Sequence, residues 1–537
     1  MGCTCIKSPL PVLNQGFLRL ENKSSDTITV AALGRPFTLG MLYDARQDEL
    51  MPGFTLWDNA TLQENITETS QRSSEFQITT SDSIDSKSSL LDVEASLRAS
   101  YMSGLIEVGG SAKYLNDQKK SNNQSRVTFQ YKATTNFEQL SMSQVANLKT
   151  EQTEAVENGL ATHVVIGILY GANAFFVFDS KRLDARSTKS IESNMEALLR
   201  KIPSFNVRGK VDIKLTDEEK DLTNKFSCKF YGDLILESNP ATFEEAVKTY
   251  VELPKLLGEK GENAAPLKVW LTPLKNLDPM AAEVISEISV GLVNKAEDTL
   301  EDLRQIEMRC NDSLEDSVSE NFPQIRKTLS SFQKLCKSYT SGLQDIMKKT
   351  LPSIRGGIQD ESSLENLFAD RDKSPFSHEK LSKWMDHKER EINIIRSCLD
   401  MMGTNPKIVR NHSELDREVL APGVEDALCF VFTSLESADP CLAAMTNYLE
   451  LLKSESASEG HWYFSDEVLT EMRRKIKTVN DVAKTVKNNK RFSFLVAAIP
   501  NKKYAGATIY HYKDGILVAD NYIKPEAKAL RGSRELL

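Results

Sequence analysis

The 537-residue sequence contains none of the short motifs that mark the common enzyme classes. It has no glycine-rich phosphate loop, no HExxH zinc-protease motif and no GxSxG nucleophile elbow. Its eight cysteines form no CxxC pair and show no metal-ligand spacing, and its six histidines are scattered singly. We therefore expect no enzyme activity, no cofactor, no metal site and no small-molecule substrate.

Long apolar runs and an excess of positive charge are also missing. No run reaches the roughly 18 residues of a membrane-spanning helix, and the start "MGCTCIKSPLPVLNQG" lacks the features of a secretory signal. A formal net charge of −9 gives no electrostatic case for a nucleic-acid partner. We expect a chain of several domains, made in the cytoplasm without a signal peptide, whose sparse cysteines are mostly reduced and buried.

The extreme N-terminus carries a possible lipidation pattern. Gly2, Cys3 and Cys5 resemble the doubly acylated tip of some membrane-anchored kinases, but Ile6 stands where a serine or threonine is usual. Two interpretations stay open at this point. The tip is either an acylated membrane anchor or a plain disordered tail.

Hydrophobic periodicity divides the rest of the chain into three regions. Residues 28–265 hold strand-like stretches separated by two long inserts, which we call the first insert (residues 81–124) and the second insert (residues 180–227). Residues 266–385 have helical periodicity, beginning with a helix predicted over 280–310. The sequence thus predicts an α+β multidomain protein: a sheet with helical inserts, followed by a helical bundle and one further domain.

The strand-like stretches of the first region cover residues 75–80, 125–135, 161–179 and 228–237. His163 lies in the third stretch, and its apolar neighbours favour a hydrogen-bonded core histidine over a ligand or base.

Residues 386–525 read as strand, helix, strand and a hairpin turning at Asp514 and Gly515, which is typical of a thioredoxin-like domain. Short tails remain at 1–27 and 526–537. Aligning Pro440 and Cys441 with the end of a Cys-Gly-Pro-Cys motif places Ala438 where the attacking thiolate belongs. A lone cysteine cannot run a dithiol cycle, although a reactive thiol at a helix start stays an alternative for Cys441.

One stretch of the first insert, "SLLDVEASLRASYMSGL" (89–105), fits two periodicities. As a helix it would expose Ala95 and Ala99 to solvent and place Glu94 inside its apolar stripe. That stripe consists of Leu90, Val93, Leu97, Tyr101, Leu105 and Val108. As a strand it would have one apolar side formed by Leu91, Val93, Ala95, Leu97, Ala99 and Tyr101.

The second insert contains a similar stretch, "FNVRGKVDIKL" (205–215), which alternates throughout. Its apolar side consists of Phe205, Val207, Gly209, Val211, Ile213 and Leu215. The stretch has the length of a transmembrane β-strand, about 9 to 11 residues. An ordinary edge hairpin explains the same pattern. Thr216 and Glu219 after it fit a helix capping box.

Several motifs closely resemble the stonustoxin/verrucotoxin family, over residues 28–523. They include "ALGRPFTLGMLYDAR" (32–46), "EVGGSAKYL" (107–115), "YGANAFFVFDS" (170–180), "SPFSHEKLSKWMD" (374–386) and "CFVFTS" (429–434). More remotely, "THVV" and "YGAN" are similar to the signature strand of the membrane-attack-complex/perforin and cholesterol-dependent cytolysin (MACPF/CDC) superfamily. The resemblance implies a perforin-like domain, a focal-adhesion-targeting-like helical domain and a thioredoxin-like domain without redox chemistry.

The resemblance also implies a function: a cytolytic, hemolytic pore-forming toxin subunit. It would oligomerise with homologous subunits on a lipid membrane and refold its two inserts into transmembrane β-hairpins. The membrane-inserting side chains would be the apolar strand faces named above, without Gly209, and Gly109, Gly110 and Gly171 would act as bends. Such a protein would leave the cell by a non-classical route and associate with membranes when active.

One departure from the family limits this expectation. Toxin subunits of the family end in a PRY/SPRY recognition domain, whereas this sequence stops after "DNYIKPEAKALRGSRELL". A non-lytic intracellular scaffold of the same family is therefore the alternative function.

Overall fold

The computed structural model of the chain describes residues 27–145, 153–183, 186–207, 210–403, 406–450, 461–486 and 489–524. These residues form two compact units. The first unit contains the described residues up to Glu301 together with Gly342–Phe368. The second contains Asp302–Ser341 and the described residues from Ala369 onward.

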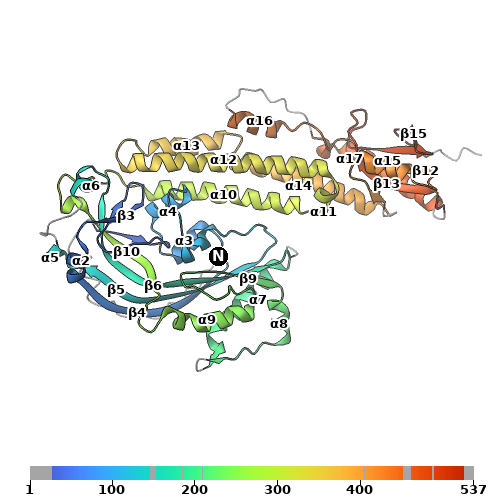
Figure 1. Cartoon of the computed structure of the whole chain (residues 1–537). Coiled ribbons are helices and arrows are strands. Elements are labelled where there is room, and N and C mark those ends of the chain that lie inside the picture. The colour runs from blue at the N-terminus through green and yellow to red at the C-terminus, as the bar shows by residue number, and fades with distance from the viewer. Residues whose placement is uncertain are drawn as a thin grey trace, which may run out of the picture. The chain divides into compact units, whose positions relative to one another are not determined.

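An eight-stranded sheet organises the first unit (Figure 1). Its central strand β6 (His163–Ser180) is a long apolar run that pairs antiparallel with four neighbours, as expected for a strand covered on both faces. The other strands are β1 (Ile28–Ala31), β2 (Met41–Asp44), β3 (Glu49–Thr55), β4 (Ile66–Thr79), β5 (Arg126–Leu140), β9 (Phe226–Gly232) and β10 (Ala265–Pro273).

The long strands bend at one level of this sheet. Pairing shifts between Ser70 and Ser73 of β4, between Thr134 and Phe137 of β5, and between Pro266 and Lys268 of β10. Because a bulge bends its strand, bulges at neighbouring positions curve the whole sheet, as β4, β5 and β6 show in Figure 1.

The two inserts cover opposite faces of this sheet. Side chains of β6 alternate: Phe175 and Val177 belong to the core cluster that includes the first insert, whereas Phe176 and Phe178 belong to the cluster that includes the second. The first insert contributes helices α3 (Ile84–Leu90) and α4 (Ala95–Met102) and the 3₁₀ turn η1 (Gly110–Asn116). The second contributes α7 (Thr188–Leu199), η2 (Ile202–Phe205), β7 (Asn206–Val207), β8 (Lys210–Val211) and α8 (Asp217–Thr223).

Further helices pack around the sheet or continue from it. Helix α9 (Phe243–Leu257) contributes Phe243 and Val247 to the second-insert core. Two long helices, α10 (Val290–Leu314) and α12 (Pro323–Arg355), begin or end in the first unit. The remaining short helices of this unit are α2 (Asn59–Asn65), α5 (Met142–Val145), α6 (Thr153–Glu157) and η3 (Leu274–Asn276).

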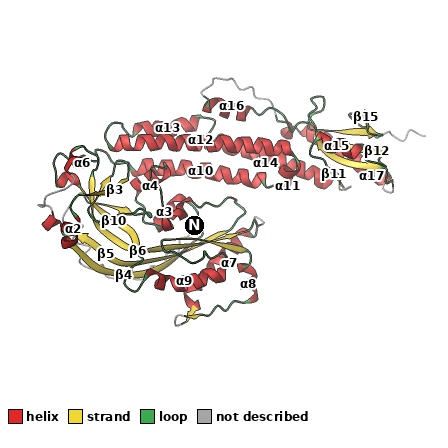
Figure 2. Cartoon of the chain, viewed as in Figure 1, coloured by secondary structure: helices red, strands yellow, loops and turns green. Residues whose placement is uncertain are grey.

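The second unit combines helices with a five-stranded sheet (Figure 2). Its strands, in spatial order, are β11 (Lys407–Ile408), β13 (Phe492–Ala498), β12 (Asp426–Phe432), β14 (Ala507–Lys513) and β15 (Ile516–Ala519). Its helices are α11 (Ser317–Asn321), α13 (Ser362–Lys373, which begins in the first unit), α14 (His378–Met401), α15 (His412–Val419), α16 (Pro440–Leu449), η4 (Trp462–Phe464) and α17 (Asp466–Thr485). Phe332 of α12 stacks on Trp384 of α14 with ring centroids 3.9 Å apart, and such contacts form the helical core.

Several local expectations are confirmed. β14 and β15 form the hairpin that turns at Asp514 and Gly515, both with positive φ as a two-residue turn requires. The six cysteines in the described part of the chain are free, and all except the half-buried Cys441 are buried. His163 is buried and shares a 2.8 Å hydrogen bond with the hydroxyl of Thr162, while burial lowers its pKa to about 4.

One predicted helix begins later than its periodicity indicates. Residues 280–289 lie outside α10, which starts at Val290. The backbone N–H groups of Ile285 and Ser286 donate instead to the carbonyl of Arg355, at 2.8 and 3.3 Å. A tertiary backbone contact therefore replaces the first turns of the predicted helix.

Candidate functional site

The first insert is helical but interrupted. Ser83 caps α3 by accepting a hydrogen bond from the N–H of Ser86, and the chain then turns through Asp92, whose φ is +54°. Helix α4 restarts after Glu94 and ends at Met102. The stretch that fits two periodicities is therefore two short helices joined by a strained turn, since a left-handed aspartate costs on the order of 1 kcal/mol.

The apolar strand face predicted for residues 91–101 lies largely within the core of the first unit. Leu91, Val93 and Leu97 are buried, and Ala95 and Tyr101 are half-buried. The expectation that Ala99 faces solvent is wrong, because its side chain is 2% exposed. Neighbours on a second side explain the difference.

Those neighbours are groups of α10 and α12. Arg98 pairs with Glu297 at 2.8 Å, and the Met102 carbonyl accepts from the Gln344 amide at 2.8 Å. Helix α4 is thus packed on two sides. The amphipathic pattern of its sequence predicts only one buried side, so more of its residues are buried than the pattern indicates.

A buried ionic cluster ties the first insert to the strands beneath it. The Arg126 guanidinium forks onto Asp179 at 2.6 and 2.7 Å and reaches Asp82 at 3.0 Å. Asp117 accepts at 3.3 Å from the same guanidinium, and Lys87 pairs with Asp82 at 2.8 Å. Asp82, Lys87 and Asp117 belong to the first insert, whereas Arg126 and Asp179 belong to β5 and β6.

The electrostatics of this cluster favour the charged forms. Burial alone would raise the pKa of Asp82, but the charges of Lys87 and Arg126 outweigh it and the pKa is lowered. The same holds for Asp117, where Arg126 and Lys229 outweigh burial. Removing Arg126, the cation that all three carboxylates share, would therefore weaken the charge compensation of the whole cluster.

A second polar cluster holds helix α4. Arg355, 1% exposed, pairs with Asp48 at 3.0 Å and donates to the hydroxyls of Ser100 and Ser96, both at 2.9 Å. Ser100 in turn donates to Asp48 at 2.5 Å. Since both serines lie on α4, this cluster anchors the helix through one buried guanidinium.

Glu94, the residue immediately before α4, has a poorly paired carboxyl. Its Oε2 atom is buried and has no hydrogen-bond partner among the described residues. Burial raises the pKa of Glu94 to about 7, with Lys268 lowering it and Asp92 raising it by smaller amounts. Glu94 lies in extended backbone before α4, so its poor pairing follows from burial at the helix start and not from a place in the apolar stripe of a continuous helix.

The second insert is held mainly by apolar contacts. Met195, Leu198, Leu199, Ile202 and Phe205 are buried in the core beneath α7 and η2. Its ion pairs, such as Arg200 with Glu196 at 2.6 Å, are exposed.

The alternating stretch 205–215 is only partly a strand. β7 and β8 pair Asn206 with Val211, Gly209 lies outside the described residues, and the burial of Val207 is likewise not described. Val211 is 37% exposed, and Ile213 and Leu215 are half-buried. The capping box that follows it, at Thr216 and Glu219, is confirmed.

The three predicted bend glycines lie at crowded positions. A Cβ on Gly171 would come within 2.0 Å of the Ala133 carbonyl oxygen, beside the bulge of β5. One on Gly110 would meet the Asp233 carboxylate at 2.5 Å, and one on Gly109 the Gly34 carbonyl oxygen at 3.2 Å. The backbone approaches closely at all three, and their role as bends stays a prediction.

Other predicted sites lie apart from the inserts. Cys441 begins α16, but burial raises the pKa of its thiol to about 11, which opposes an activated thiolate. Gly2, Cys3 and Cys5 lie outside the described residues. Among the described residues no group of three or more potential metal-ligating side chains is present, and no helix has the length and apolarity to cross a membrane.

Sequence reasoning missed the two arginines that hold the first insert. Arg126 opens a strand in which polar and apolar residues alternate, and it lies on the polar side with Thr128 and Gln130, so no local pattern indicates a buried ion pair. Arg355 closes a long helix, where an arginine is ordinary, and no pattern distinguishes it.

Family profiles match the three regions in turn. "SNTX, MACPF/CDC-like domain" matches residues 27–253, "Stonustoxin helical domain" residues 298–393, and "Thioredoxin-like SNTX domain" residues 405–524. The fold class is confirmed: a MACPF/CDC-like domain, a helical domain and a thioredoxin-like domain.

Curated relatives match along nearly the whole chain. Neoverrucotoxin subunits beta and alpha of Synanceia verrucosa are 47% and 46% identical, each over 95% of this chain and 74% of the relative. Cytolytic toxin-beta of Scorpaena plumieri is 47% identical over 93% of this chain and 72% of its own length. A solved stonustoxin structure superposes with a TM-score of 0.76 at 43% identity, covering 93% of this chain and 70% of that one. The chain therefore belongs to the stonustoxin/verrucotoxin family.

Proposed function

We propose that this chain is a pore-forming, cytolytic toxin subunit whose first and second inserts refold into membrane-spanning β-hairpins. One observation carries the proposal: both inserts continue directly from sheet strands and keep alternating apolar stretches folded against opposite faces of the same strand, β6. An insert that follows a strand can extend that strand when released, and its alternating side chains then give one face to lipid.

The membrane-facing side chains in this proposal come from both alternating stretches. They are Leu91, Val93, Ala95, Leu97, Ala99, Tyr101, Phe205, Val207, Val211, Ile213 and Leu215. Hairpins in lipid require partners at their edges, because an unpaired backbone group there costs several kcal/mol. Oligomerisation is therefore part of the mechanism. Relatives named as alpha and beta subunits support a homologous subunit as partner. A relative named as a cytolytic toxin supports a lipid membrane as target.

Release of a fluorescent dye from liposomes tests this function directly. We expect release from vesicles by the purified chain mixed with a related subunit, and electron microscopy should show rings on the same vesicles. If no related subunit produces release under any lipid composition, the non-lytic scaffold becomes the better account.

The thioredoxin-like domain has a packing role in this proposal and no reductase activity. Asp439 caps α16 by accepting from the N–H groups of Cys441 and Leu442, and its Oδ2 accepts from the Trp384 indole at 2.8 Å. An insulin-reduction assay should show no turnover. Insulin reduction that is abolished by Cys441→Ser would contradict the absence of reductase activity.

Two further expectations stay predictions. They are the domain boundaries at residues 265 and 385 and the acylation of the N-terminus.

A further inference from the structure

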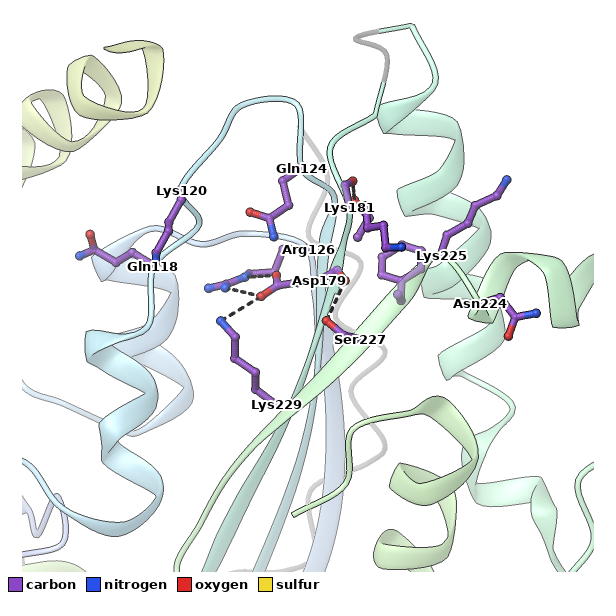
Figure 3. Close-up of a pocket in the computed structure, with 12 residues that line it drawn as sticks. Gln118, Lys120, Gln124, Arg126, Asp179, Lys181, Asn224, Lys225, Ser227 and Lys229 are labelled. Carbon is purple, nitrogen blue, oxygen red and sulfur yellow. Dashed lines mark hydrogen bonds and ion pairs between the residues drawn. The ribbon is translucent and has the colours of Figure 1, made fainter. Parts of the chain in front are cut away.

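A small cavity lies where the two inserts join the sheet. It has a volume of about 280 Å³ and is lined by three segments: the end of the first insert (residues 118–124), the start of the second (180–181) and its end with the first residues of β9 (224–229). Figure 3 shows these segments converging around Arg126 and Asp179. The cavity therefore exists only while both inserts keep their soluble arrangement.

The charges of the lining are unequal. Its titratable side chains are four lysines and Arg126 against a single carboxylate, Asp179. Arg126 and Lys229 are already paired with carboxylates, Lys229 with Asp117 and Asp179 at 3.2 Å each. Lys181 and Lys225 have no side-chain hydrogen bond or ion pair among the described residues, so their charges remain available.

An uncharged donor, the side-chain amide of Gln124, also lines the cavity. The amide of Gln124 is half-buried and lies next to Arg126 in Figure 3, and it makes no hydrogen bond within the described chain. A concave site with uncompensated lysines and an amide donor concentrates and binds anions. Its volume is at the lower limit for ligand pockets, which suits a phosphate group better than a drug-sized molecule.

We propose that this cavity, at Lys181, Lys225 and Gln124, is a binding site for a phosphate group, carried either by a small soluble anion or by a lipid headgroup. Because the cavity is lost when the inserts extend, a bound phosphate stabilises the soluble state by mass action. The binding site stands independently of pore formation. Its effect on refolding rests on the proposed function.

The test uses pyrophosphate as the probe, at constant ionic strength and without divalent cations. We expect millimolar pyrophosphate to raise the Tm of the full chain by at least about 2 °C. The double variant Lys181→Gln/Lys225→Gln should lose this rise. The matched control Lys255→Gln/Lys260→Gln, which neutralises two exposed lysines away from the cavity, should keep it. The proposed site would be overturned if sodium chloride raised the Tm by the same amount. It would also be overturned if the two double variants showed equal changes in Tm with pyrophosphate.

Vesicles distinguish the two sources of phosphate. The protein is sedimented with phosphatidylcholine vesicles that contain phosphatidylinositol 4-phosphate. If wild type and the control Lys255→Gln/Lys260→Gln sediment with the vesicles and Lys181→Gln/Lys225→Gln does not, the phosphate belongs to a lipid headgroup. A pyrophosphate response without such sedimentation would identify a soluble anion. If pyrophosphate raises the Tm but leaves the rate of dye release unchanged, the site stands and its effect on the refolding of the inserts is overturned.

Discussion

The two inserts are held against the same sheet by different forces. The first is held by buried charges. Arg126 of β5 forms ion pairs with three carboxylates, two of them in this insert. Arg355 holds α4 through an ion pair with Asp48 and hydrogen bonds to two serines. The second relies on apolar packing of α7 and η2, and its ion pairs are exposed. Exposed pairs contribute about 0 to 1 kcal/mol each, whereas breaking a buried pair costs about 3 to 5 kcal/mol.

This difference predicts an order of events. Releasing the second insert costs mainly apolar burial, which a membrane can replace. Releasing the first separates buried charges that lipid cannot solvate. We therefore expect the second insert to leave the sheet first, and the first insert to be the controlled step.

The largest effect should follow loss of Arg126. Arg126→Met leaves the buried Asp82 and Asp179 and the half-buried Asp117 without their shared cation, so the free energy of unfolding should fall by about 3 to 5 kcal/mol. Denaturation by urea measures it. Arg200→Met removes a cation of the second insert in an exposed pair and should cost less than about 1 kcal/mol. Equal losses would show that the two inserts are not held differently.

A smaller and more local effect should follow loss of Arg355. Arg355→Met leaves Asp48 short of a partner and frees Ser96 and Ser100. Amide hydrogen exchange in α4 should therefore accelerate by about 30- to 150-fold, for a loss of about 2 to 3 kcal/mol. Lys348→Met makes the same charge change on an exposed face of α12 and should leave α4 unchanged. Unchanged protection of α4 in Arg355→Met would argue against an anchoring role.

Glu94 should make the first insert sensitive to pH. Its pKa is about 7 in the soluble fold and its ordinary value is 4.5, so the folded state holds the proton more tightly between these values. Stability from this group is complete below pH 4.5 and declines as pH rises through 7, by up to about 3 kcal/mol.

Glu94→Gln should therefore gain stability relative to wild type between pH 5 and pH 8, measured by urea denaturation at both values. Glu107→Gln, an exposed carboxylate of the same insert, should show no such gain. A Glu94→Gln difference that does not change with pH would contradict the buried, poorly paired carboxyl.

The smallest effect on the soluble fold should come from Val211→Lys. Val211 is 37% exposed, so the free energy of unfolding should change by no more than about 0.5 kcal/mol. In lipid the lysine should cost about 2 to 4 kcal/mol near the bilayer midplane, and dye release should fall. Asn206→Lys, exposed and on the opposite side of the alternating stretch, should keep both stability and release. Equal release by the two variants would remove Val211 from the lipid face.

Much of the fold could be predicted from local patterns. The long apolar run of β6, the hairpin at Asp514 and Gly515 and the capping box at Thr216 are set by neighbouring residues, and the structure contains all three. The burial of Ala99 and the late start of α10 could not be predicted, because both depend on contacts with distant residues of α10 and α12.

Of the candidate site, the alternating stretches could be predicted from the sequence, but the buried ionic clusters could not. Period-two alternation in an otherwise helical insert is visible in the sequence and locates both stretches. The buried clusters around Arg126 and Arg355 join residues that are distant in the sequence: Arg126 and Asp82 are 44 positions apart, and Arg355 and Ser100 are 255 positions apart. No local pattern marks such pairs.

The central claim is that the alternating stretches become strands in lipid, and a scan across residues 211–215 tests it most directly. A fluorophore is placed at one position at a time on Val211→Cys, Asp212→Cys, Ile213→Cys, Lys214→Cys and Leu215→Cys, and its quenching by nitroxide-labelled lipid is measured on vesicles. Strong quenching at 211, 213 and 215 with weak quenching at 212 and 214 is the predicted result. Quenching that is uniform, absent or repeats every three to four residues would contradict the refolding of the second insert.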